Sequence, residues 1–217
     1  MTPKTPSVAH SFKKSAEELC TFIEQEGWAV RPYHHESLPF FLQLNDVERA
    51  GAVELLRQYL EICQRVYSRG RRLKDMPFFV ETALEYYDYK IFPDTLVHLR
   101  AEPAKMVEFY STKHTQFFRS LNFFEFTSYT IEDLYCRQWV HLYDREEAMT
   151  MRILSEANAV LADQSQKPII VPEAHVIKER LSLERLQVRM QNLQLEPLKK
   201  NGHVDGIMAV ADCTWSL

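Results

Sequence analysis

Apolar residues recur at every third or fourth position in the first part of the chain, the spacing of one face of an α-helix. Ser15 and Glu18 have the spacing of a capping box, in which the two side chains satisfy backbone amides of the first turn. We therefore expect a short amphipathic helix that starts at Ser15 and ends at Gly27. Residues 1–14, with Pro3 and Pro6, are expected to form a flexible tail.

A longer helix is predicted from Asn45, which forms a second capping-box pattern with Glu48, to Gly70. Its apolar positions form two neighbouring stripes, so packing is expected on two sides. A stripe left exposed would be a patch of the kind that marks interaction sites. The expected partner or dimer interface consists of Val53, Leu55, Leu56, Tyr59, Leu60, Ile62 and Val66. The alternative is that the helices expected at 16–26 and 78–89 cover the second stripe within one chain.

A third helix is predicted over Phe78–Tyr89, with Pro77 early in its first turn. It completes a helical region that we assign to residues 15–92. Beyond this point the pattern changes to short runs of apolar and aromatic residues, which are typical of strands. We therefore expect a second region over residues 93–217.

The second region begins with a predicted β-hairpin at Met106–Tyr110 and Thr115–Ser120. Thr130 and Asp144 are each followed by an acidic residue three positions later, which predicts two helix starts. From Pro168 onward the pattern returns to strands. These are Ile169–Val171, Val176–Leu183, Leu186–Leu195 and Gly206–Asp212.

The alternation of apolar and polar residues shifts phase at Asn192, as a β-bulge would produce, and Asn201–Gly202 predicts a turn. The expected fold class is therefore α+β: an N-terminal helical region followed by a five-stranded antiparallel sheet. Two helices, at Ile131–Tyr135 and Arg145–Ala162, are expected between the second and third strands.

This order resembles the PAS family, whose fold is a five-stranded antiparallel sheet with helices that cross one face between its second and third strands. Three stretches carry the resemblance. Phe123–Trp139 is similar to an aromatic-rich helix and the cap that follows it, with Ser128 where glycine is usual. Leu142–Glu146 is similar to the start of the connector helix, without its usual proline. Asn201–Thr214 is similar to the terminal hairpin, with Cys213 where isoleucine is usual.

The resemblance implies a sensory or interaction domain with a ligand pocket or partner surface between the sheet and the crossing helices. Aromatic walls with a few polar tips suit flat ligands. The residues expected to line such a pocket are Phe117, Phe123, Phe124, Phe126, Tyr129, Tyr135 and Trp139. The alternative is that these rings fill the core, because aromatic side chains bury large areas whether or not a cavity remains.

No cofactor is identified by the sequence. The reactive-cysteine motif of flavin photosensors is absent, so Cys136 is a poor candidate for photochemistry. His141 is the one histidine considered as a haem ligand, but a lone histidine at a helix end is more often a hydrogen-bonded structural residue. His34 and His35 are adjacent and have no partner at metal-ligand spacing, so we expect no metal.

Composition narrows the function further. The chain of 217 residues has no run of roughly 18 apolar residues for a membrane span and no secretory signal, which predicts a cytoplasmic protein. The four cysteines form no CxxC pair and are expected to be reduced. Only five glycines occur, in no phosphate-binding motif. The net charge of −4 gives no overall attraction to nucleic acid.

We therefore expect a non-catalytic signalling or regulatory protein that acts through protein contact, as a homodimer or with a signalling partner, and through a small bound ligand. Because the last predicted strand lies at the end of the sequence, output is expected through the N-terminal helices or a partner. One alternative is a small-molecule enzyme with an α+β cavity fold, using scattered residues such as Asp88, His98 and His175. Another is a nucleic-acid-associated regulator that uses the basic stretch 65–74, whose cations can also complement a helix C-terminus.

Overall fold

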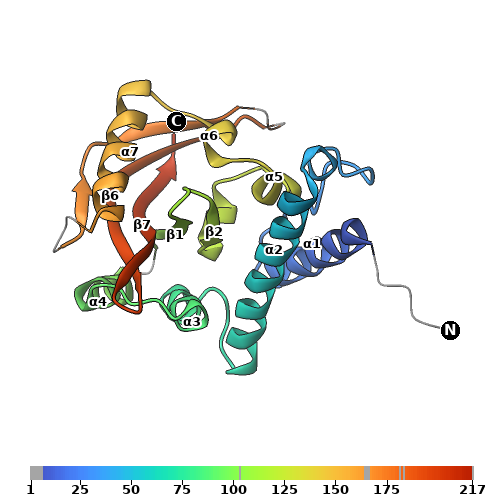
Figure 1. The fold of residues 1–217 in the computed structure, drawn as a ribbon, viewed down its shortest axis with the longest axis horizontal. Helices are drawn as coiled ribbons and strands as arrows, with labels where there is room; N and C mark the ends of the chain where they lie inside the picture. Colours follow the sequence, from blue (N-terminus) through green and yellow to red (C-terminus); the bar gives the residue numbers. More distant parts are fainter. Residues whose placement is uncertain (1–6, 103, 164–166, 181, 183, 217) are drawn as a thin grey trace.

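The computed structural model describes residues 7–102, 104–163, 167–180, 182 and 184–216. A group of N-terminal helices is followed by an antiparallel sheet with further helices between its strands (Figure 1). This arrangement confirms the mixed α+β class. Within these residues, no helix combines the length and the apolar character needed to cross a membrane.

The first helix, α1, spans Val8–Gln25 and therefore begins earlier than the sequence predicted. Ser7 is its N-cap and accepts a hydrogen bond from the His10 amide at 3.2 Å, whereas Ser15 lies inside the helix. The buried face starts already at Phe12, which extends the apolar stripe by one turn. The expected tail is thus wrong for residues 8–14, and residues 1–6 lie outside the described part of the chain.

Three more helices complete the N-terminal half: α2 (Asp46–Ser68), α3 (Met76–Tyr87) and α4 (Pro93–Ala101). The capping box predicted for α2 is confirmed, since the Glu48 amide donates to Asn45 at 3.0 Å and the Asn45 amide donates to Glu48 at 2.9 Å. No helix was predicted at α4, which lies in the stretch assigned to the start of the second region. A short 3-10 helix, Phe41–Gln43, precedes α2.

Within the described residues, the sheet contains seven strands, not the expected five. Six of them follow the spatial order β2-β1-β7-β6-β5-β3, and β4 pairs separately with β6; all pairs are antiparallel. The strands are β1 (Met106–Ser111), β2 (Gln116–Arg119), β3 (Tyr143–Asp144), β4 (Ile169–Val171), β5 (His175–Glu179), β6 (Gln187–Lys200) and β7 (His203–Trp215).

β4 and β5 lie in stretches that the sequence predicted as strands, whereas β3 was not predicted. β4 and β5 pair with successive parts of the same strand, β6, and Pro172 follows directly after β4. Proline lacks a backbone amide and cannot continue a hydrogen-bonded ladder, so the chain leaves the sheet and re-enters it at His175. β3 is only two residues long and pairs with the outer edge of β5.

The long β6–β7 hairpin confirms the predicted bulge and turn. Its register shifts between Gln191 and Gln194, and Asn192 has a φ of 51°. Asn201 and Gly202 form the connecting turn, both with positive φ. Gly206 allows a close strand approach, because a Cβ atom there would lie 2.5 Å from the carbonyl oxygen of Tyr110.

Between β2 and β4 the chain forms a 3-10 helix, Leu121–Glu125, and then α5 (Ile131–Cys136), α6 (Trp139–Leu142) and α7 (Glu147–Leu161). The capping box of Thr130 with Asp133 at the start of α5 is confirmed. The predicted start of the following helix at Asp144 is wrong, since this residue pairs in β3 and α7 begins at Glu147.

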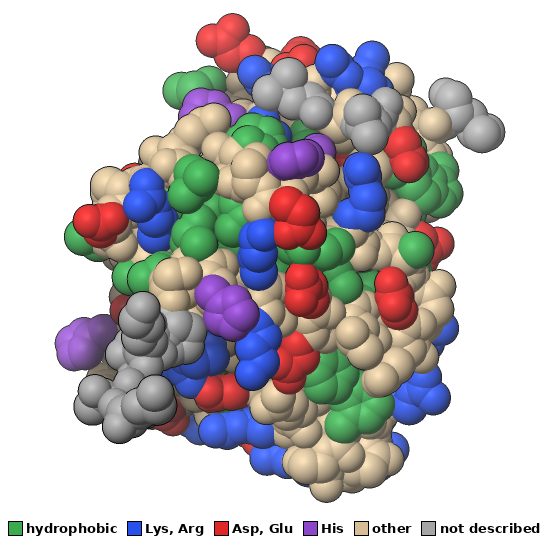
Figure 2. Space-filling model, turned by 90° about the vertical axis from the view of Figure 1, so that its right-hand side faces the viewer, with side chains coloured by type: hydrophobic (Ala, Val, Ile, Leu, Met, Phe, Trp, Pro, Cys, Tyr) green, Lys and Arg blue, Asp and Glu red, His purple; other side chains and the backbone are tan. Residues whose placement is uncertain are grey.

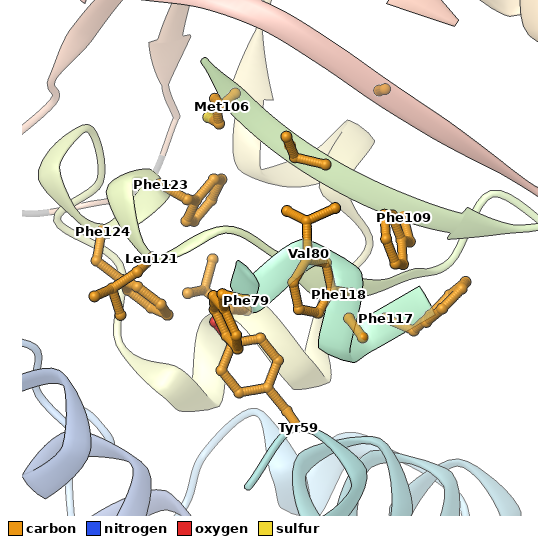
Figure 3. Packing of buried hydrophobic residues seen from close by; sticks show 14 of the residues in the cluster. Tyr59, Phe79, Val80, Met106, Phe109, Phe117, Phe118, Leu121, Phe123 and Phe124 are labelled. Carbon is orange, nitrogen blue, oxygen red and sulfur yellow. The ribbon is translucent and has the colours of Figure 1, made fainter. Parts of the chain in front are cut away.

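The sheet has two covered faces. We call the face toward α2, α3 and α4 the helical face, and the face toward α6 and α7 the α7 face (Figure 1). On the helical face, Tyr59, Phe79 and Phe118 point toward one another, with ring centroids 5.1–5.8 Å apart (Figure 3). The buried apolar residues of the helices and the sheet form one continuous cluster. The two regions expected from the sequence therefore share a core.

Candidate ligand-binding site

Two adjoining cavities lie between the α7 face of the sheet and the helices α6 and α7, with volumes of about 60 and 40 Å³. Both are lined by the same five residues, and each has further walls of its own. The shared residues are Glu108, Tyr110, Trp139, Arg145 and Met190. The first cavity continues between α7 and the long hairpin, and the second continues toward Phe123 and Phe126.

The two-residue repeat of the strands explains the lining. On β1, Glu108 and Tyr110 project to the α7 face, whereas Val107 and Phe109 alternate with them and are fully buried in the core. The remaining wall of the first cavity is largely apolar. It consists of His114 with Ile153, Leu154 and Ala157 from α7, and Leu193, Leu195, Ile207 and Ala209 from β6 and β7.

Glu108 is the acid of the site and is only 8% exposed. It accepts a hydrogen bond from the side chain of Gln116, across the β1–β2 hairpin. Burial raises the pKa of its carboxyl group, while the positive charges of Arg119 and Arg145 act in the opposite direction. The protein therefore favours the neutral form of this carboxyl more than water does.

Arg145 lies between β3 and α7 and lines both cavities. Its Nε atom is buried and has no hydrogen-bond partner, and its guanidinium lies 5.7 Å from the ring centre of Trp139. Among the described residues, its Nη2 atom donates to the Met190 sulfur at 3.9 Å, which is a weak acceptor. Burial lowers the pKa of Arg145, which remains a cation at physiological pH. The guanidinium group of Arg145 can therefore donate further hydrogen bonds to a ligand in the site.

Arg119, on β2, provides a second guanidinium group next to Glu108. Arg119 is 1% exposed and sits directly opposite Glu108 in the β1–β2 register. It donates to the Leu134 carbonyl at 3.3 Å, but its Nε and Nη1 atoms have no partner. Its charge is otherwise balanced by the aromatic faces of Phe123 and Tyr135, at 5.3 and 5.1 Å.

His175, on β5, is a polar residue next to Met190 of the cavity wall. It pairs across the sheet with Met190 and is 8% exposed. Its Nδ1 atom lies 3.3 Å from the Glu173 carbonyl, which assigns the proton to Nδ1, and its buried Nε2 atom has no partner. Burial, and next the charge of Arg145, lowers the pKa of this imidazole, so it stays neutral near pH 7.

Three of the seven predicted pocket residues, Phe123, Phe126 and Trp139, line the second cavity, and Trp139 also lines the first. The other four do not line these cavities. Phe117 packs against Tyr87 at 5.0 Å, Phe124 packs edge-on against Phe123, Tyr129 donates to the Leu142 carbonyl, and Tyr135 lies over Arg119.

Sequence reasoning missed the polar half of the site, namely Glu108, Tyr110, Gln116 and Arg145. One signal was present: a glutamate within the buried run of a predicted strand, which is costly unless its charge is compensated. Arg145 carried no such signal, since it lies in a connection and reaches Glu108 only through the tertiary fold.

The histidines considered for cofactors lie elsewhere. His141 is exposed in α6. His34 contacts the buried Asp133 at 2.6 Å, and His35 pairs with Ser37 at 2.9 Å. In the part of the chain that the structure describes, no three histidine, cysteine, aspartate or glutamate side chains are grouped so that they could hold a metal ion.

The expected interface on α2 is not exposed, which corrects the basis of that prediction. Leu56, Tyr59, Leu60, Ile62 and Val66 are buried, and Val53 and Leu55 are partly buried against the core. α1 and α3 pack on α2 and cover its stripes within one chain, as the alternative stated. The two-sided pattern was correct, but both sides are used for folding.

The basic stretch is paired within the chain. Arg69, Arg71 and Arg72 form ion pairs with Glu85, Asp75 and Glu26. Arg65 and Lys74 lie over the rings of Tyr86 and Trp28, each at 4.6 Å. Figure 2, which views the molecule from the side of α1 and α2, likewise shows basic and acidic side chains interspersed. Three of these five cations are therefore paired with acidic side chains of the same chain, and the other two lie over aromatic rings.

The residues considered for catalysis are dispersed. Asp88 caps the C-terminus of α3 with a φ of 59°, His98 lines a groove beside α4 on the helical face, and His175 lies by the α7 face. Among the described residues, the buried side-chain atoms without a hydrogen-bond partner include Arg145 Nε in the cavity wall, whereas others, such as those of Glu26, Glu132 and Glu196, lie elsewhere. The chain matches no family model, and no curated protein is similar to it.

Proposed function

We propose that this chain is a non-catalytic regulatory protein in which a PAS-like module binds a small molecule beneath α6 and α7. One observation carries the proposal: a cavity with largely apolar walls contains a buried guanidinium nitrogen without a partner. Unpaired buried polar atoms cost free energy, so a ligand that satisfies them stabilises the folded state. Apolar walls with a few convergent polar groups are the usual construction of small-molecule sites.

The strand order supports the PAS resemblance. Five strands, in the spatial order β2-β1-β7-β6-β5, form a continuous antiparallel arrangement. Along the chain, the helices α5, α6 and α7 lie between β2 and β5, the second and third of these five strands. The cavity lies between the sheet and two of these helices, α6 and α7, where the resemblance implies a ligand. The module proposed here corresponds to residues 93–217.

Contacts between α5 and the segment before α2 provide a connection from the cavity to the N-terminal helices. The Ile131 amide donates to the Arg31 carbonyl at 3.0 Å, and Glu132 accepts from the amides of Phe40 and Phe41 at 2.8 and 3.1 Å. α6, which follows α5, contributes the tryptophan that lines both cavities. A ligand that displaces α6 would therefore act on contacts that hold the N-terminal half, where we propose that a protein partner reads the signal.

Native mass spectrometry of the purified protein, with an absorbance scan, tests the binding function. We expect a small molecule retained by the native chain and released on denaturation. Ala157→Leu, which extends a side chain into the first cavity, should abolish retention. Ala148→Leu, at an exposed position near the start of the same helix, should not change it. Equal retention by both variants, or an empty native protein that also binds nothing in a small-molecule screen, would contradict the proposal.

A further inference from the structure

We infer that the cavity takes a small monocarboxylate with a short apolar tail, with the carboxylate on Arg145 and the tail between α7 and the β6–β7 hairpin. This inference rests on the proposed binding function and adds the chemical class of the ligand. It follows from three properties of the site: the balance of its charges, the geometry of its free donors and the size of its apolar part.

The charges around the site are unbalanced. Two guanidinium groups lie near Glu108, which among the described residues is the one acidic side chain that lines the cavities. They belong to Arg145, which also lines both cavities, and to Arg119, which lies opposite Glu108 on β2. Burial favours the neutral form of the Glu108 carboxyl. The neighbouring His175 is kept neutral by burial and by Arg145. Among the described residues, neither arginine forms an ion pair with a carboxylate. A cavity with this excess of positive charge and low exposure favours an anion and disfavours a cation.

The free donors fit a carboxylate. In the part of the chain that the structure describes, the Arg145 Nε atom is buried without a hydrogen-bond partner, and the neighbouring Nη2 atom contacts a thioether sulfur at 3.9 Å. These two nitrogens form one edge of the guanidinium fork, which binds the two oxygens of a carboxylate with parallel hydrogen bonds. A neutral amide offers only one acceptor oxygen to the same edge and leaves the buried charge uncompensated.

The size of the apolar part limits the tail. Ile153, Leu193, Leu195, Ile207 and Ala209 form a wall without hydrogen-bonding side chains. The first cavity has a volume of about 60 Å³ and the second about 40 Å³. Space of this order holds a ligand of a few heavy atoms, since about 10–15 Å³ of such space is enough for one water. A three- or four-carbon acid fits this limit, whereas a flat polycyclic cofactor would require α6 and α7 to move.

Titration calorimetry with butyrate, butyramide and n-butylammonium tests the inference, because these probes share a tail and differ in charge. We expect butyrate to bind the intact chain at least tenfold more tightly than either of the others. Arg145→Met should weaken butyrate binding at least tenfold. Arg152→Met, which removes a half-exposed arginine of α7 that pairs with Glu173, should leave it unchanged.

Butyramide or butylammonium binding as tightly as butyrate would overturn the inference, and this comparison uses only the intact chain, so it does not depend on the folding of a variant. Unchanged butyrate affinity in a folded Arg145→Met protein would overturn it as well. If none of the probes binds while native mass spectrometry finds a retained, cavity-dependent molecule, the carboxylate class fails and the binding function stands. If nothing is retained and nothing in a broad screen binds, the binding function itself fails.

Discussion

The two faces of the sheet differ although the same strands build both. On the helical face, Phe109 and Phe118 lie 4.6 Å apart and are fully buried with Tyr59 and Phe79 of the N-terminal helices. On the α7 face, Glu108 and Tyr110, which alternate with Phe109 along β1, line the two cavities. Glu108 is a buried acid. Alternate residues of β1 therefore have different roles: those on the helical face pack in the core, and those on the α7 face line the candidate site.

Because of this difference, we expect the helical face to determine the stability of the fold and the α7 face to determine ligand binding. Close-packed aromatic rings lose many contacts when one of them is truncated, whereas residues that border a cavity already lack some of their contacts. Buried polar groups without hydrogen-bond partners cost free energy on the α7 face, and the close packing on the helical face offsets this cost.

The largest expected effect comes from truncating the same residue type on each face. Phe109→Ala should lower the free energy of unfolding by about 3–5 kcal/mol, because it leaves a void in a fully packed cluster. Phe126→Ala, at a half-buried ring that lines the second cavity, should cost only about 1–2 kcal/mol. Urea denaturation of both variants measures the two values. Equal losses would remove the distinction between the faces.

Glu196 is an acid on the helical face, and it should make stability depend on pH. It is fully buried on β6, accepts from Thr95 of α4 at 2.7 Å, and burial raises its pKa from the ordinary 4.5 to about 8. Below pH 4.5 the group is protonated in both states. As the pH rises from 4.5 to 8, the unfolded chain loses this proton while the folded protein keeps it, so stability falls.

Glu196→Gln should remove this pH dependence, which amounts to roughly 4 kcal/mol between pH 4.5 and 8. Glu184→Gln, at an exposed position, is the matched control and should retain it. Thermal denaturation over this pH range gives the comparison. If stability falls with pH equally steeply in the Glu196→Gln variant and in the intact chain, the buried Glu196 carboxyl ionises as easily as it does in the unfolded chain, and the prediction is wrong.

A smaller effect is expected at the hydroxyl group that joins the helices to the sheet. The Tyr59 hydroxyl donates to the Arg119 carbonyl at 2.7 Å, and the residue is fully buried. Tyr59→Phe should cost about 1–3 kcal/mol because it leaves a buried carbonyl unsatisfied. Tyr33→Phe removes a hydroxyl that bonds Glu17 and Glu36 near the surface and should cost less than about 1 kcal/mol. A Tyr59→Phe variant as stable as the intact chain would contradict the account of this contact.

A smaller effect on stability than at Phe109 is expected at Trp139. The sequence predicted that this residue lines a pocket, with a filled core as the alternative, and it is half-buried and borders both cavities. Trp139→Ala should therefore cost about 1–2 kcal/mol in unfolding experiments. A loss above about 3 kcal/mol would place Trp139 with the packed cluster and weaken its assignment to the cavity wall.

The predictable parts of the fold are the ones that depend on near neighbours in the chain. The capping boxes at Asn45 and Thr130, the hairpin of β1 and β2, and the bulge at Asn192 all follow from residues a few positions apart. The start of α1 and the helix α4 were missed although each has a local signal, the Ser7 cap and Pro93 in the first turn, whereas the short strand β3 depends on pairing with β5, far along the chain. Local propensity does not contain that information.

The candidate site was predictable only in its aromatic part. Phe123, Phe126 and Trp139 cluster in the sequence and also in space. Arg145, by contrast, reaches Glu108 because α7 crosses the sheet, and neither residue indicates the other in the sequence. The two stripes of α2 show the converse case, in which a correct pattern led to an expected interface that α1 and α3 in fact cover.

The most direct test of the account is to locate binding by methyl NMR during a titration with butyrate. If the cavity beneath α6 and α7 is the ligand site, the methyl signals of Ile153, Leu193 and Leu195 should shift in a saturable way. Those of Leu56 and Val66, buried in the helical region, should stay unchanged or move only slightly. Saturable shifts confined to the helical region would contradict the central claim, as would no shift at the cavity methyl groups with butyrate or with any molecule the protein retains.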